Sequence, residues 1–167
     1  GGWGVGFYQN IANVIKTMPN NLENIYNFLK LSDSIATAGQ PTTQQFTIIK
    51  LSNYQAVINL ALLDSPNALP NEESIVKSLG MEYIHIPVIW ENPTIEDITR
   101  FFSVMKDSSN KRVFIHCAAN KRVSAFIYLY RIIQQGLKKE QAQKDLHRIW
   151  IPNEIWQNFI QQIIDYF

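Results

Sequence analysis

The sequence has a single cysteine, Cys117, in 167 residues. One thiol excludes an internal disulfide and a metal site built from several cysteines, and it is typical of a reducing compartment. No apolar stretch approaches the roughly 18 residues that a membrane span needs. Charged residues are only 17% of the chain and the formal net charge is +1. The sequence therefore lacks the basic field of a nucleic-acid-binding protein and the acidic run of a solvated tail.

What the chain has in quantity is apolar and aromatic side chains, at 46% and 12% of the residues. This composition argues against disorder and, at this length, predicts one domain around one core. We predict a single domain over residues 1–167, with an N-terminal helical extension over 1–30 and C-terminal helices over 138–167. The predicted location is cytoplasmic, and the Gly1-Gly2 start leaves a removed N-terminal signal open.

Short β-type stretches alternate with helical patterns from residue 34 onward. We expect strands at 34–41, 55–63, 82–88 and 111–116. Helices are expected at 42–51, 75–79, 95–105, 123–135, 139–148 and 154–166, and apolar spacing before residue 30 (Ile11, Val14, Ile15, then Ile25, Phe28, Leu29) indicates one or two more. The alternation predicts an α/β fold: a mostly parallel sheet of about four or five strands with helices on both faces.

The stretch Val113–Arg131, VFIHCAANKRVSAFIYLYR, leads from a strand through Cys117 into an amphipathic helix. In parallel sheets, ligands bind beyond the carboxyl ends of the strands. Loop N–H groups and a helix N-terminus together attract an anion, and the same field lowers the pKa of a thiol. A thiolate can attack a bound phosphorus, and an arginine at the end of the loop can bind two of its oxygens.

The residues from His116 to Ser124 resemble the signature of cysteine-dependent protein tyrosine and dual-specificity phosphatases. Three further stretches, TAGQPTTQQF, VINL and LGMEYIHIPV, resemble the bacterial beta-lactamase-hydrolase-like phosphatase family, and the similarity covers roughly residues 30–135. The resemblance implies a dual-specificity-phosphatase-like fold and phosphomonoester hydrolysis through a phosphocysteine intermediate. It implies a phosphorylated small molecule or phosphoprotein as the partner, and we assign no cofactor and no metal.

By this resemblance, Cys117 is the nucleophile, Arg122 clamps the phosphoryl oxygens and Ser124 helps the thiolate to leave. His116 is expected to support the loop through hydrogen bonds. The residues expected to bind the phosphate are Ala118, Ala119, Asn120, Lys121, Arg122 and Val123. Asn120 stands where the family often has glycine, and asparagine is among the few residues that tolerate the left-handed conformation.

The spacing departs from the family pattern. Phosphatases of this superfamily place five residues between Cys and Arg, whereas this sequence has four and puts Val123 where Arg would stand. If the loop keeps its usual length, Arg122 is turned by about 100° from the usual direction. If the loop is one residue shorter, Arg122 takes the usual role and one inward N–H group is lost. Removing such a donor costs about 3–4 kcal/mol in the transition state, so phosphate binding is a firmer expectation than fast turnover.

Hydrolysis also needs a general acid that protonates the leaving oxygen. The resemblance implies an Asp on the loop after the strand at 82–88, and that loop offers Glu91 as the best candidate, with Trp90 as an anchor. Asp64, after the strand at 55–63, is a weaker candidate. Asp97 stands three residues after Thr94, a spacing typical of a helix cap, and we assign it that role.

Two other functions stay open at this point. The short spacing and the missing Asp favour a phosphate-binding module with weak catalysis, and a single cysteine before a helix also suits a rhodanese-like sulfurtransferase. The plainest alternative makes Cys117 a buried apolar residue at a strand end.

Outside the loop, no residue is assigned a ligand. His85 and His147 lack metal-spaced partners, and Glu72 and Glu73 are assigned to a capped or solvated helix start. The helix at 154–166 is expected to dock on the domain. The sharper alternative is a homodimer or partner contact through an exposed aromatic face of that helix.

Overall fold

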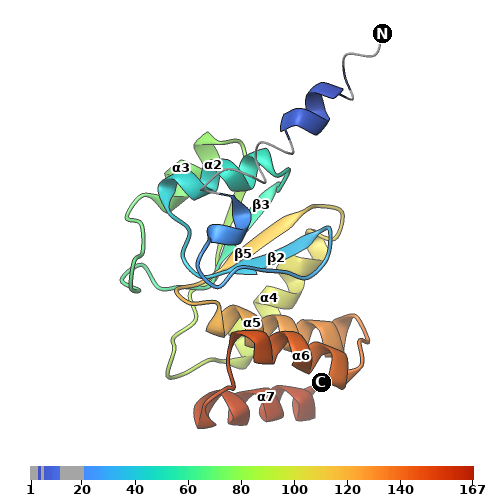
Figure 1. Cartoon of the computed structure of the whole chain (residues 1–167). Helices are drawn as coiled ribbons and strands as arrows, with labels where there is room; N and C mark the ends of the chain where they lie inside the picture. Colours follow the sequence, from blue (N-terminus) through green and yellow to red (C-terminus); the bar gives the residue numbers. More distant parts are fainter. Residues whose placement is uncertain (1–3, 5, 12–20) are drawn as a thin grey trace.

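The structure is a computed structural model that describes residue 4, residues 6–11 and residues 21–167. Its centre is a five-stranded sheet in the order β1-β2-β5-β3-β4 (Figure 1). The strands are β1 (Leu29–Lys30), β2 (Ile35–Ala38), β3 (Ala56–Asn59), β4 (Glu82–His85) and β5 (Val113–His116). β1 runs antiparallel to β2 and all other neighbours are parallel. The predicted mostly parallel α/β sheet is confirmed.

Helices cover both faces of the sheet, as predicted. On one face lie α2 (Thr43–Leu51) and α3 (Glu72–Ser78), and on the other lie α4 (Ile95–Asp107) and α5 (Lys121–Leu129), which a π-helical turn, η2 (Tyr130–Gln134), extends (Figure 1). Outside α5 pack α6 (Lys139–Ile149) and α7 (Glu154–Tyr166). One apolar cluster packs on each face of the sheet. Because both faces are covered, every residue of β3 and β5 is buried.

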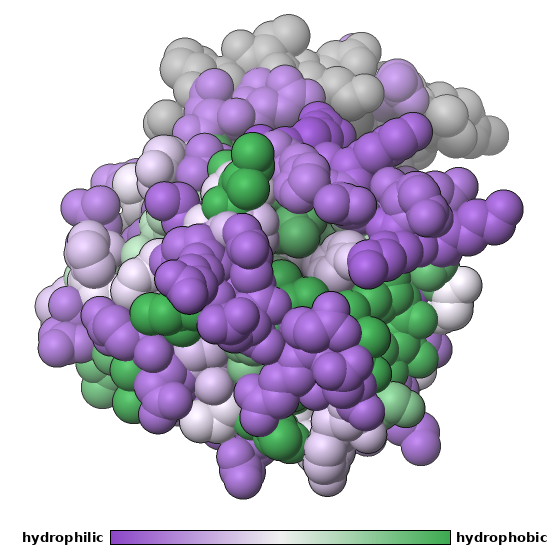
Figure 2. All heavy atoms as spheres, turned by 90° about the horizontal axis from the view of Figure 1, so that it is seen from below, coloured by the Kyte–Doolittle hydropathy of each residue, from purple (hydrophilic) through white to green (hydrophobic). Residues whose placement is uncertain are grey.

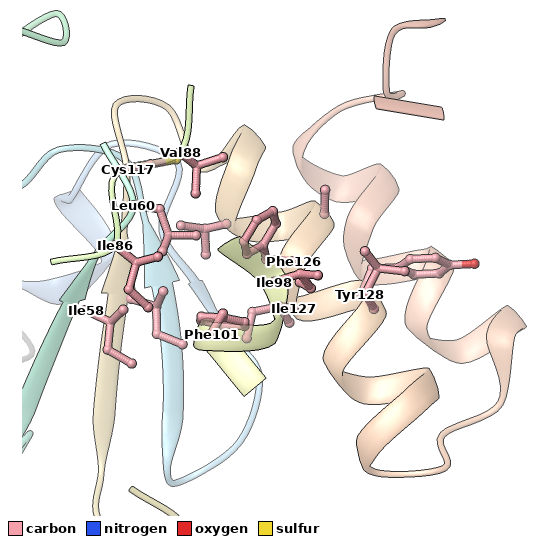
Figure 3. Packing of buried hydrophobic residues seen from close by; sticks show 14 of the residues in the cluster. Ile58, Leu60, Ile86, Val88, Ile98, Phe101, Cys117, Phe126, Ile127 and Tyr128 are labelled. Atoms are coloured by element: carbon pink, nitrogen blue, oxygen red, sulfur yellow. The ribbon is translucent and has the colours of Figure 1, made fainter. Parts of the chain in front are cut away.

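The larger cluster reaches the carboxyl end of the sheet, where the site forms. Figure 3 shows Cys117 and Val88 at one end of this cluster, above Leu60 and Ile86. The chain after β3, β4 and β5 therefore enters the same region from three neighbouring strands. This is the edge at which the sequence places a ligand.

Local signals explain several helix boundaries. Thr42 and Thr94 each cap a helix with the capping-box pattern, with Gln45 and Asp97 as the reciprocal partners. Each pair satisfies two backbone donors that a helix start leaves free. Gly80 takes φ +82° just after α3, a conformation that favours glycine and ends the helix.

The helix expected around Ile25, Phe28 and Leu29 is wrong. The chain forms a short 3₁₀ turn, η1 (Leu22–Asn24), then a left-handed residue, Asn27 at φ 50°, and then strand β1. β1 pairs with β2 and closes the edge of the sheet, so pairing outweighs the helical spacing. The first group of apolar residues expected to form a helix is Ile11, Val14 and Ile15. Ile11 lies in a helical segment, residues 6–11, whereas Val14 and Ile15 lie outside the described residues.

Helix α7 docks on its own chain, as the ordinary interpretation predicts. Trp156, Phe159 and Ile163 are buried against the larger cluster. Figure 2 shows the underside of the molecule as hydrophilic side chains around separate hydrophobic patches. The aromatic face is thus covered from within, which leaves the homodimer through this helix without support. Within the described residues, no helix is both long and apolar enough to cross a membrane.

Candidate active site

A pocket of about 400 Å³ opens where the chain leaves β5. Cys117 lies at its base and is 1% exposed. The pocket brings together residues from three loops and the start of α5: Leu62, Asp64, Ser65, Pro66, Trp90, Glu91, Cys117, Ala118, Ala119, Lys121 and Arg122. Most of the residues predicted for the site therefore meet here, whereas His116, Asn120, Val123 and Ser124 lie behind the pocket wall and are buried.

Hydrogen bonds from behind the loop set the direction of its peptide groups. The carbonyl of Cys117 accepts from His116 Nδ1 at 3.2 Å, and that of Ala118 accepts from the Gln40 N–H at 3.1 Å. In a trans peptide the following N–H points opposite to the carbonyl. The N–H groups of Ala118 and Ala119 therefore point away from these partners. The carbonyl of Ala119 is held in turn by Asn27 Nδ2, at 3.0 Å.

The loop and the first turn of α5 leave several donors unused. Within the part of the chain that the structure describes, the N–H groups of Ala118, Ala119, Lys121, Arg122 and Val123 have no hydrogen-bond acceptor. Unsatisfied donors of this kind, at the N-terminus of a helix, carry partial positive charge and attract an anion. The arrangement is suited to a phosphoryl group held beside the Cys117 thiol.

Asn120 supports the loop from within the protein. Its backbone is left-handed, at φ 64°, as its residue type predicts, and it forms the N-cap of α5. Its Nδ2 donates to the carbonyl of Asn27 at 2.9 Å and to Thr37 Oγ1 at 3.0 Å. Gly39 approaches the same loop so closely that a Cβ there would lie 2.8 Å from the Ala118 carbonyl oxygen. The loop is therefore held from below by residues far away in sequence.

Arg122, rather than Val123, faces the pocket. Arg122 is 6% exposed and its guanidinium donates through Nη1 to the carbonyl of Val88 at 2.9 Å, whereas Val123 is fully buried in the core. Of the two geometries considered from the sequence, this matches the loop that is one residue shorter. A guanidinium has five N–H donors, so the bond to Val88 leaves others for a bound oxyanion.

One buried carboxylate beside the site is not predicted from the sequence. Glu72, at the start of α3, is 4% exposed and pairs with His116, its Oε2 lying 2.7 Å from Nε2, while Gln40 Nε2 donates to its Oε1 at 2.7 Å. Burial alone would raise the pKa of Glu72, but the hydrogen bond and charge of His116, with help from Gln40 and Tyr83, hold that pKa below its usual value. Two consecutive glutamates at a helix start give no sign of which one is buried.

Two candidate acids reach the pocket, and the third does not. Glu91 and Asp64 both line it, each from a different loop, and both are exposed. Asp97 caps α4 through Thr94, as predicted. Within the described residues, no three His, Cys, Asp or Glu side chains cluster closely enough to hold a metal ion.

Three tryptophans brace the loop that carries Glu91. Trp90 lies 5.3 Å from Trp150 and 5.8 Å from Trp156 between ring centroids, and its carbonyl accepts from Trp156 Nε1 at 3.0 Å. Trp150 Nε1 in turn donates to Ser124 Oγ at 3.0 Å, and that hydroxyl donates to the Lys121 carbonyl at 2.8 Å. The Ser124 hydroxyl thus already has two partners, and its role toward the thiolate stays a prediction.

Residues 9–157 match the family described as a DSP-PTPase phosphatase fused to NAD+ kinase. The chain belongs to this family. Among solved structures, it is similar to a DUF442 candidate phosphatase from Shewanella putrefaciens CN-32, with 33% identity and a TM-score of 0.79 over 87% of this chain and 96% of that one. The kinase-associated phosphatase KAP, at 14% identity, shares the fold with a TM-score of 0.74 over 86% of this chain and 97% of that one.

Among curated proteins, the family member is similar to the beta-lactamase hydrolase-like proteins of two Xylella fastidiosa strains. Identity is 26% over 116 residues, which is 68% of this chain. The chain spans 27% of the length of these curated relatives. The predicted relation to cysteine-dependent phosphatases is confirmed, and the sulfurtransferase alternative is not favoured.

Proposed function

We propose that this domain hydrolyses phosphoric monoesters with Cys117 as the nucleophile. The observation that carries the proposal is one pocket that holds the thiol, the Arg122 guanidinium and a set of N–H groups without acceptors. Phosphoryl transfer needs this combination: donors for the three equatorial oxygens of the transition state and a nucleophile in line with the bond that breaks. The catalytic-site cysteine named for KAP gives the assignment support by analogy.

The reaction takes two displacements at phosphorus. In the first, the Cys117 thiolate forms an S–P bond, the P–O bond to the leaving group breaks, and the acid on the rim protonates the departing oxygen. In the second, water attacks the phosphocysteine and gives its proton to the same carboxylate. The S–P bond then breaks, and inorganic phosphate and the thiolate are released. Arg122 and the loop N–H groups hold the three non-bridging oxygens throughout.

Glu91 is the acid that we favour. It follows Trp90, whose carbonyl is fixed by Trp156, and the same segment is tied to Arg122 through the Val88 carbonyl. The Glu91 backbone is therefore braced against both the phosphate-binding arginine and the C-terminal helix. Asp64 lines the same pocket from the loop after β3 and is the alternative.

The rim of the pocket favours substrates with one phosphate and an apolar or aromatic body. Whichever of Asp64 and Glu91 does not serve as the acid repels additional negative charge, while Trp90, Leu62 and Pro66 offer apolar surface. We therefore propose aryl phosphates and phosphotyrosine-type groups ahead of polyphosphorylated substrates.

The test is hydrolysis of a set of aryl phosphates with leaving groups of graded pKa, by the wild type, Cys117→Ser and Arg122→Lys. Arg131→Lys is the matched control, since Arg131 pairs with Asp145 away from the pocket. We expect no turnover for Cys117→Ser, a loss of about 10²–10³-fold for Arg122→Lys, and no change for Arg131→Lys. Removal of the acid, by Glu91→Gln or Asp64→Asn, should slow substrates with poor leaving groups far more than those with good ones.

A second measurement separates binding from turnover. Inorganic phosphate should protect Cys117 from iodoacetamide in the wild type and much less in Arg122→Lys. Protection without turnover of any aryl phosphate would show a phosphate-binding module and refute the hydrolase. Absence of both would refute the site.

A further inference from the structure

Glu72 is a buried carboxylate that the proposed reaction does not use. It is 4% exposed, lies on the opposite side of His116 from the cysteine loop, and comes from α3 rather than from any pocket-forming element around Cys117. Burying an ionised carboxylate is costly unless it is paired and hydrogen-bonded. Here the partners are His116 and Gln40, at 2.7 Å each.

The hydrogen bonds of His116 fix how many protons its ring holds. Nδ1 lies 3.2 Å from the Cys117 carbonyl oxygen and Nε2 lies 2.7 Å from a Glu72 carboxylate oxygen. A carbonyl oxygen only accepts, and so does an ionised carboxylate. With Glu72 ionised, both ring nitrogens must donate, and only the imidazolium form has two N–H groups.

Gln40 favours the ionised form of Glu72. Its Nε2 donates to Oε1, so the carboxylate accepts from both sides. The same bonds, together with the His116 charge, hold the pKa of Glu72 below its usual value despite the opposing effect of burial.

We propose that Glu72 is a positioning residue that keeps His116 cationic and doubly hydrogen-bonded behind the Cys117 loop. The cation has two effects. It holds the Cys117 carbonyl turned away from the pocket, which aims the Ala118 N–H at the anion, and it stabilises the neighbouring thiolate. The inference deepens the proposed function, since it concerns the reactivity of the same thiol.

The other charges near these groups do not replace this effect. Around Cys117, the pocket holds Lys121 and Arg122 as cations and Asp64 and Glu91 as anions. Around Glu72 lie Tyr83, whose pKa burial raises so that it stays neutral, and the exposed pair Glu73–Lys77 on α3. The His116 ring contacts the Cys117 carbonyl with one nitrogen and the Glu72 carboxylate with the other, so we take the cation to be the nearer of the two charges to the thiol.

This order of contacts makes the sign of the test decisive. In Glu72→Gln, the amide can donate to Nε2 of a neutral His116, so the side chain keeps its shape and a hydrogen bond while both charges disappear. Loss of the nearer positive charge raises the thiol pKa. If His116 were neutral in the wild type, removal of the Glu72 charge alone would lower the thiol pKa instead.

The experiment is the rate of Cys117 alkylation by iodoacetamide as a function of pH. We expect the Glu72→Gln profile to shift upward by about one unit, which is about a tenfold lower rate at a pH below both midpoints. The control is Glu73→Gln, which removes the neighbouring exposed carboxylate, and its rates should stay within about twofold of the wild type. An unchanged or lowered midpoint in Glu72→Gln would overturn the proposal.

A measurement on the wild type keeps the test valid if Glu72→Gln folds poorly. The chain has three histidines, so ¹⁵N-detected imidazole spectra can resolve His116. We expect both of its ring nitrogens to carry protons near pH 7, and a single neutral tautomer there would refute the inference. Neither experiment needs turnover, so a domain without hydrolase activity could still confirm or refute this role of Glu72.

Discussion

Replacing Gly39 by alanine tests how far the anion site depends on backbone packing beneath the loop. A Cβ at this position would lie 2.7 Å from Tyr26 Cδ1 and 2.8 Å from the Ala118 carbonyl oxygen. Tyr26 is 58% exposed and its ring can swing into solvent. The Ala118 oxygen belongs to the loop backbone and accepts from the Gln40 N–H, so it can move only with the loop.

The expected effect is larger on the site than on the fold. Inserting one methyl group into a filled space costs about 1–3 kcal/mol of stability. Moving the Ala118 carbonyl also rotates the N–H of Ala119, because the two share one peptide plane. Losing one donor to a developing oxyanion costs about 10²–10³-fold in rate. We therefore expect weaker protection of Cys117 by inorganic phosphate and a fall of that size in aryl phosphate hydrolysis.

Gly136→Ala is the matched control for Gly39→Ala. Gly136 has φ +67° and no atom within 4 Å of a built Cβ, so alanine there strains the backbone far from the pocket. Thermal melting should fall for both variants, while phosphate protection and turnover should fall only for Gly39→Ala. Protection and turnover in Gly39→Ala within about twofold of the wild type would refute the dependence on packing under the loop.

Three further predictions follow from the contacts around the site. Trp156→Phe removes the Nε1 hydrogen bond to the Trp90 carbonyl but keeps an aromatic ring. The hydrolysis of aryl phosphates with poor leaving groups should become about three- to tenfold slower, with little effect on those with good leaving groups. Equal effects on both would argue against a braced acid loop. Ser124→Ala leaves Trp150 Nε1 without its acceptor, and it should cost about 1 kcal/mol in urea unfolding. Because the hydroxyl already has two partners, we expect no burst of released phenol, against the role that the phosphatase resemblance implies for Ser124; a burst would support that role instead. Because the pKa of Glu72 is lowered in the folded state, its contribution to stability is present above the unfolded value of 4.5 and is lost as the pH falls through the folded value. The difference in unfolding free energy between the wild type and Glu72→Gln should therefore shrink below pH 4.5, and a difference constant from pH 3 to 7 would contradict the pairing.

Local chemistry made much of the fold predictable. Thr94 and Asp97 form a capping box whose spacing is visible in the sequence, and Gly80 ends α3 through its positive φ. Asn120 takes the left-handed conformation that its residue type tolerates. Each of these features depends on a few neighbouring residues, so one sequence is enough to expose it. The segment around Phe28 and Leu29 is different, because its β conformation comes from pairing with β2.

Contacts between distant residues explain what the sequence could not show about the site. Glu72 and His116 are 44 positions apart, and Ser124 and Trp150 are 26 apart. Whether Glu72 or Glu73 is buried depends on how α3 is rotated against the sheet, and no local pattern encodes that angle. Ser124 is expected, from the resemblance to the phosphatase signature, to help the thiolate to leave, yet its hydroxyl accepts a hydrogen bond from Trp150 in the C-terminal part of the chain.

The short spacing between Cys117 and Arg122 has a structural answer in the start of α5. The helix begins at Lys121, so Arg122 is its second residue and lies one step of about 100° before Val123. Val123 is thereby directed into the core, where it is fully buried, and Arg122 is directed to the pocket. Asn120 makes the early helix start feasible, because its left-handed backbone turns the chain within a loop of three residues. The loop of three residues and the helix start at Lys121 thus direct Arg122 rather than Val123 to the pocket, which supports the proposed role of this arginine in binding the phosphoryl oxygens.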